Sequence, residues 1–99
     1  MNVSIVRGGG FAGIATRTQL ASDALPTAAC RRLKELAAQV EPASDAAPRH
    51  PDETLYKVEV NGIIATHSET TLPEPVRALI DFVCDRPERQ DGLELPGLR

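Results

Sequence analysis

Apolar and polar residues alternate at the start of the chain, with the two-residue period of a half-buried strand. Val3 and Ile5 form the first such stretch, and a second runs from Ile14 to Leu20 after three consecutive glycines. The glycines end the first strand and permit a tight return of the backbone. The two stretches are therefore predicted to pair antiparallel, with residues 7–12 as a hairpin tip.

A second pair of strands is predicted on either side of Asn61-Gly62. Alternation covers residues 55–60 before this dipeptide and 63–66 after it. Asn-Gly supplies the two positive φ angles that a two-residue hairpin requires. This turn sets Val60 opposite Ile63 and predicts that Ile63 faces the core.

Each pair of strands is followed by apolar residues at helical spacing. The first helix follows Pro26, which fits the first helical turn. The second follows Thr71-Leu72-Pro73-Glu74, which has the pattern of a capping box. The two apolar stripes consist of Ala29, Leu33, Leu36 and Val40 in the first helix and Val76, Leu79, Ile80 and Val83 in the second.

The order strand, strand, helix, strand, strand, helix (ββαββα) predicts an α+β fold with a four-stranded antiparallel sheet covered by two helices. Residues 1–85 are expected to form a single domain. Residues 86–99 are polar and contain two prolines and two glycines, so we expect a flexible C-terminal tail.

Composition excludes several partner classes. The formal net charge is −3 with acids and bases interspersed, so the chain has no cationic footprint for nucleic acid and no polybasic membrane anchor. No stretch approaches the length of a membrane span, and no basic segment precedes an apolar run at the start. We expect a cytoplasmic protein without a cofactor.

No catalytic or metal-binding motif is present, so we expect a protein that is not an enzyme. Cys30 and Cys84 lack a second ligand at metal spacing and are predicted to pack in the core. His50 and His67 have no plausible nucleophile beside them, and His67 is expected at a strand end. The triple glycine opens no helix, which argues against a phosphate site.

The predicted topology brings three irregular segments to one end of the sheet. They are the tip at residues 7–12, the proline-rich loop at 41–53 and the connection at 67–71. Phe11 and Asp52 lie in the first two and together offer an aromatic anchor and a carboxylate. Two alternatives stay open: Phe11 could cap the core, and Asp52 could serve only to start the third strand.

Four ordered stretches resemble the emfourin-like protealysin inhibitors, small bacterial proteins that block thermolysin-family zinc metalloproteases. They are Gly9–Ile14 (GGFAGI), Asp23–Pro26 (DALP), Asp52–Tyr56 (DETLY) and Leu72–Phe82 (LPEPVRALIDF). The resemblance implies that the chain plugs a protease cleft that holds a zinc ion beside an apolar pocket.

On this reading the inhibitor has no metal of its own. Asp52 would approach or ligate the zinc of the protease, since aspartate oxygen is a competent zinc ligand. Asp45, in the same loop, is the alternative carboxylate, and Phe11 would fill the apolar pocket. The predicted protease-binding residues are Gly9, Gly10, Phe11, Ala12, His50 and Asp52.

The rival hypothesis is a non-enzymatic interaction module or a homo-oligomer. Val6, Leu55 and Ile64 are apolar residues on the sheet face that no helix is expected to cover. A contiguous apolar patch there would favour self-association. The inhibitor hypothesis instead predicts a monomer.

Overall fold

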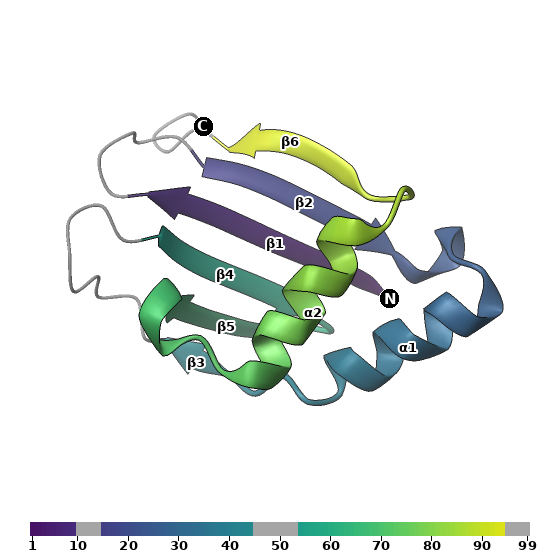
Figure 1. Cartoon of the computed structure of the whole chain (residues 1–99), viewed down its shortest axis with the longest axis horizontal. Coiled ribbons are helices and arrows are strands. Elements are labelled where there is room, and N and C mark those ends of the chain that lie inside the picture. Colours follow the sequence, from purple (N-terminus) through teal and green to yellow (C-terminus); the bar gives the residue numbers. More distant parts are fainter. Residues whose placement is uncertain (10–14, 45–53, 95–99) are drawn as a thin grey trace.

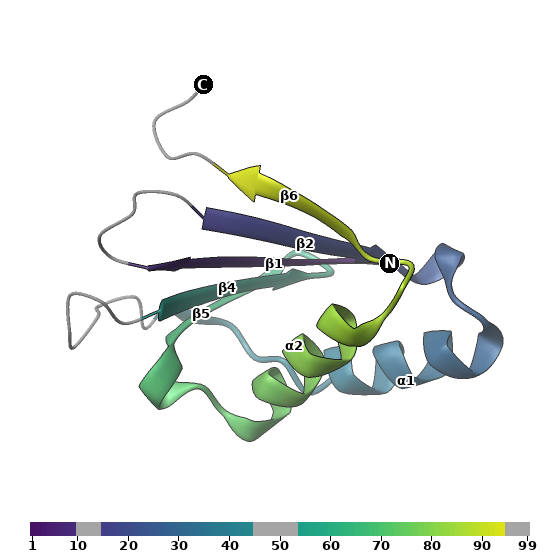
Figure 2. The ribbon, with the colours of Figure 1, turned by 45° about the horizontal axis from the view of Figure 1, so that its top comes forward.

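The computed structural model describes residues 1–9, 15–44 and 54–94 of the chain. These residues form two layers, in which both helices cover one face of a sheet and the other face is bare (Figures 1 and 2). The elements are β1 (Asn2–Gly9), β2 (Ala15–Ala21), the 3-10 turn η1 (Ser22–Ala24), α1 (Thr27–Ala37), β3 (Ala43–Ser44), β4 (Thr54–Val60), β5 (Ile63–Ser68), the 3-10 turn η2 (Glu69–Thr71), α2 (Glu74–Asp85) and β6 (Gln90–Glu94).

The predicted α+β class is confirmed, but the predicted number of strands is wrong. The described residues form a sheet in the order β3-β5-β4-β1-β2-β6. The pairs from β5 through β4, β1 and β2 to β6 are all antiparallel, and the two-residue β3 pairs parallel with β5. The order ββαββα holds for the longer elements as far as α2, after which β6 is added.

The first hairpin is longer than predicted. Arg7 and Gly8 pair with Thr16 and Ala15 as part of β1, so they belong to the strand and not to a hairpin tip. Glycine is tolerated there because β1 is paired on both sides, and the ladder holds the backbone extended.

The second hairpin has the predicted register. Asn61 and Gly62 have φ angles of 50° and 80°, as a two-residue turn with two positive φ angles requires. Val60 lies opposite Ile63. Ala65 is consequently buried, whereas Ile64 points to the bare face and is exposed.

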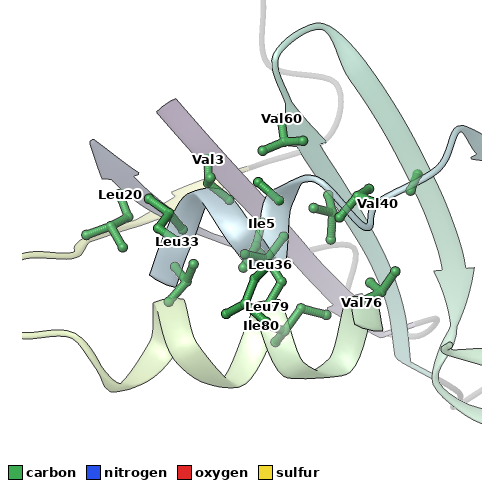
Figure 3. Packing of buried hydrophobic residues seen from close by; sticks show 14 residues of the cluster. Val3, Ile5, Leu20, Leu33, Leu36, Val40, Val60, Val76, Leu79 and Ile80 are labelled. Atoms are coloured by element: carbon green, nitrogen blue, oxygen red, sulfur yellow. The ribbon is translucent and has the colours of Figure 1, made fainter. Parts of the chain in front are cut away.

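One hydrophobic core lies between the sheet and the helices (Figure 3). The strands contribute the residues predicted by their alternation, and the helices contribute both predicted stripes except Ala29, which is only half-buried. Val40 is buried although α1 ends at Ala37, because tight backbone bonds continue the chain past the helix end. Fully burying one such aliphatic side chain contributes about 1.5–3 kcal/mol.

Prolines set where the helices begin. Pro26 and Pro73 are the N-cap residues of α1 and α2, and neither helix start has a side-chain cap. The predicted capping box at Thr71 is therefore wrong. A residue before proline is pushed out of the helical region, and Leu72 is indeed extended. Thr71 lies in η2, where its hydroxyl is 2.9 Å from that of Ser68.

The C-terminal segment contributes a strand that the sequence did not predict. Arg86 holds Glu88 through two hydrogen bonds of 2.9 and 2.8 Å in the turn after α2. The chain then forms β6, which pairs antiparallel with β2 at the edge of the sheet. The Thr18 hydroxyl, buried in β2, donates to the Asp91 carboxylate at 2.9 Å and joins residues 73 positions apart.

Candidate functional site

The two segments predicted to form the site are attached to the sheet at the same end. Gly9, the last residue of β1, pairs with Thr54, the first residue of β4. Gly8 pairs with Leu55 on one side and Ala15 on the other. The described residues that flank segments 10–14 and 45–53 are thus neighbours on adjacent strands, as the topology predicted. We call the end of the sheet at Gly9, Ala15 and Thr54 the loop pole.

The third predicted segment also starts at the loop pole. Ser68, the last residue of β5, lies opposite Leu55, and η2 follows directly. The Ser68 side chain is buried and bonded to the Thr71 hydroxyl, which fixes the first turn of this connection. The turn at Asn61 and Gly62 lies at the opposite end of β4.

Most of the predicted protease-binding residues lie outside the described residues. Gly9 is the exception, and its backbone belongs to β1. The residues outside are Gly10, Phe11, Ala12, His50 and Asp52, together with the alternative Asp45. Their roles stay a prediction. The structure adds the positions of the strand ends from which the two segments extend.

On the helix-covered side, the loop pole has a row of polar and aromatic residues. Arg7 follows Val3 and Ile5 in alternation and therefore shares their face. It pairs with Thr16 in β2 and with Tyr56 in β4. Tyr56 is half-buried against the core, so this row marks where the core ends and the loop pole begins.

His67 lies opposite Tyr56 and is half-buried near the end of β5. The strand-end position predicted for it is therefore confirmed.

An open depression lies beside this row, between the last turn of α2 and strands β1, β2 and β6. Its volume is about 470 Å³, and its lining includes Arg7, Thr16, Thr18, Cys84, Arg89 and Asp91. Arg89 donates from Nε to Asp91 at 3.1 Å and from Nη1 to the Arg86 carbonyl at 2.8 Å. The Asp91 carboxylate therefore accepts bonds on both oxygens, from Thr18 and from Arg89.

The thiol of Cys84 forms part of this wall. Burial raises the pKa of Cys84 above its ordinary value of 9.0, against the opposing effect of the Arg7 guanidinium. The thiol is consequently neutral at physiological pH and packs against the core, as predicted for a structural cysteine.

Sequence reasoning did not find the depression. It assigned Arg7 to the hairpin tip and Arg89 and Asp91 to the tail. The alternation of β1 offered one signal, because it places Arg7 on the same face as Val3 and Ile5.

The bare sheet face does not present one continuous apolar patch. Ile64, the one large hydrophobic residue classed as exposed in the described part of the chain, is 44% exposed. Its cross-strand neighbour is Glu59, and Lys57 lies between Ile64 and Leu55 on the adjacent rows of this face. Val6 pairs with Lys57 on one side and Arg17 on the other. Charged residues thus separate Ile64 from Leu55 and flank Val6 on both sides, which weakens the argument for self-association through this face.

Neither a metal centre nor a membrane span is found in the part of the chain that the structure describes. Over residues 1–9, 15–44 and 54–94, no group of three or more His, Cys, Asp or Glu residues could hold a metal ion. No helix in the same ranges is long and apolar enough to cross a membrane.

Comparison with known proteins gives one match. The family model described as Emfourin matches residues 5–84, which run from β1 to the last turn of α2. No curated protein and no solved structure matches the chain significantly.

Proposed function

Because the chain belongs to the Emfourin family, we propose that it is a protein inhibitor of thermolysin-like zinc metalloproteases. The inhibitor acts from the loop pole, where segments 10–14 and 45–53 enter the active-site cleft of the protease together. It is not an enzyme, and it works as a monomer.

The observation that carries this proposal is the pairing of Gly9 with Thr54. This pairing brings the strand that ends two residues before Phe11 next to the strand that begins two residues after Asp52. Phe11 and Asp52 are more than 40 positions apart in sequence. An aromatic anchor and a carboxylate that start from adjacent strands can reach one cleft simultaneously. A central strand paired on both sides also gives them a rigid base, which reduces the entropy lost on binding.

In this mechanism the two side chains have separate tasks. Asp52 approaches the open coordination position of the protease zinc, where a carboxylate oxygen is a competent ligand. Phe11 fills the adjacent apolar pocket, with Ala12 beside it. Gly9 and Gly10 let the backbone come close to the cleft, and His50 adds a further contact with the protease.

Inhibition constants of Asp52→Ala and Phe11→Ala against a thermolysin-family protease test the assignment. A central anchor residue contributes about 2 kcal/mol or more, so each variant should inhibit about 30-fold less well. Asp23→Ala is the matched control, because Asp23 is an exposed aspartate in η1, at the other end of β2 from the loop pole. It should inhibit like the wild type.

Melting temperatures of the same variants separate binding from folding. If Phe11→Ala lowers the melting temperature strongly, Phe11 caps the core and is not the anchor. If Asp45→Ala abolishes inhibition and Asp52→Ala does not, the zinc-facing carboxylate is Asp45. Sedimentation velocity should give a monomer, and a dimer would favour association through the bare sheet face.

A further inference from the structure

Arg7 provides a positive charge beside the loop pole that no described carboxylate neutralises. It lies two residues before Gly9 in β1, on the face covered by the helices, and it is exposed. Within residues 1–9, 15–44 and 54–94, the ion pairs are made by Arg32, Arg86 and Arg89, and none involves Arg7.

The other charged groups of the depression are already paired. Asp91 accepts from Thr18 and from Arg89, so its charge is matched by the Arg89 guanidinium. The Cys84 thiol is neutral, because burial keeps its pKa above the ordinary value. Among the described residues that line the depression, two guanidinium groups and one carboxylate leave one net positive charge, which belongs to Arg7, while Asp81 of α2 acts on Cys84 from outside this lining.

We infer that this depression is a carboxylate-binding site, and that it receives an acidic side chain of the target protease on the guanidinium of Arg7. The inference rests on the proposed function, because it adds a second contact beside the one made at the loop pole. Arg7 pairs with Tyr56, and the next two residues of β4 toward the loop pole are Leu55 and Thr54. A protease seated on the loop pole therefore lies only two residues along β1 from Arg7.

The chemistry of the site selects a carboxylate. The planar fork of arginine binds a carboxylate through two parallel hydrogen bonds. A phosphate would bring up to two negative charges close to Asp91, whereas the site has only one positive charge to offer. The exposed Thr16 hydroxyl, on the strand next to Arg7, lies on the same wall and donates to the Arg7 carbonyl at 3.5 Å.

The first experiment measures inhibition by Arg7→Gln, Arg7→Lys and the control Arg31→Gln. Arg31 is an exposed arginine of α1, and its loss changes the net charge equally without touching the depression. A hydrogen-bonded charge pair makes Arg7→Gln about tenfold or more weaker as an inhibitor. Arg7→Lys keeps the charge but loses the fork, so its inhibition should lie between those of the wild type and Arg7→Gln. Raising the salt concentration should weaken the wild type more than Arg7→Gln.

If Arg7→Gln and Arg31→Gln lose the same small factor, the effect is one of net charge, and the inference is overturned. Unchanged melting temperatures in both variants exclude a folding defect as the cause of any loss.

The second experiment needs no protease and uses acetate as the probe. Titration of the isotope-labelled chain with sodium acetate, at constant ionic strength against sodium chloride, should shift the amide resonances of Thr16, Thr18 and Gly92. The same shifts should be absent in Arg7→Gln.

The two experiments distinguish a failure of the proposed function from a failure of the carboxylate site. If the chain inhibits no protease but acetate still shifts these resonances through Arg7, the proposed function is wrong and the carboxylate site stands without its protease source. If inhibition is observed but neither experiment depends on Arg7, the carboxylate site is wrong and the proposed function stands.

Discussion

Replacing Gly62 by alanine should destabilise the protein through backbone strain alone. Gly62 has a φ angle of 80°, and a Cβ atom added there would meet nothing within 4 Å. The methyl group therefore neither clashes nor packs, and the cost is that of a left-handed conformation for an L residue. This strain amounts to about 1–2 kcal/mol.

Gly92→Ala is the matched control for this variant. Gly92 also has open space at its Cβ position, but its φ angle is not in the left-handed region. Both substitutions reduce the conformational freedom of the unfolded chain, which stabilises by about 0.4–1 kcal/mol where the native φ is allowed. Because this gain is common to both, the difference between the two variants isolates the strain.

The assay is thermal and urea unfolding of both variants. For a chain of this size about 1 kcal/mol corresponds to about 5 °C, so Gly62→Ala should melt about 5–10 °C below Gly92→Ala. Its protease inhibition should be unchanged, since the turn lies at the end of β4 away from the loop pole. Equal melting temperatures would refute the strain argument, and lost inhibition with a folded protein would refute the location of the binding surface.

Two further predictions concern the C-terminal segment. Thr18→Val removes the donor to Asp91. For a hydrogen bond of about 1 kcal/mol, this loss should speed amide hydrogen exchange in β6 about fivefold. The control Thr16→Val should leave this exchange rate unchanged. The hydrogen bonds from Arg86 lower the pKa of Glu88 below its ordinary value of 4.5, so their stabilisation is present above that value and is lost as the pH falls through the folded-state pKa. Glu88→Gln should therefore melt below the wild type at neutral pH, and this difference should shrink as the pH falls below 4.5 through the folded-state pKa of Glu88.

Each of these two predictions has an outcome that would contradict it. Unchanged exchange in β6 of Thr18→Val would mean that backbone pairing with β2 alone holds the strand. A stability difference for Glu88→Gln that persists in acid would show that the carboxylate charge is not its source.

The sequence predicts the elements whose signal is local. Asn61-Gly62 determines a turn by its own backbone preference, and the register of β4 and β5 follows from it. Alternation of Val3 and Ile5, or of Val58 and Val60, identifies strands because one face of each is buried. The convergence of the two segments at the loop pole follows from antiparallel connectivity, without knowledge of any side chain.

The sequence does not predict elements that are held by contacts between residues far apart in the chain. β6 is an edge strand with the polar sequence QDGLE, and its Asp91 lies opposite Thr18, whose buried hydroxyl donates to the carboxylate. β3 has two residues and no pattern of its own. The local capping signature at Thr71 is overridden by the extended Leu72 before Pro73. The depression combines residues from β1, β2, α2 and β6, so no single stretch of sequence contains it.

If the chain inhibits a protease as proposed, the central position of β1 bears on the consequence of cleavage by that protease. A peptide bond hydrolysed between Gly9 and Ala15 would leave an amino-terminal piece that is still hydrogen-bonded to β2 on one side and to β4 on the other. The nicked molecule would stay assembled under native conditions and separate only in denaturant, a difference that gel filtration and a denaturing gel reveal together. Cleavage at this site would then not release the protease from inhibition, because the two pieces of the cleaved chain would stay paired in the sheet.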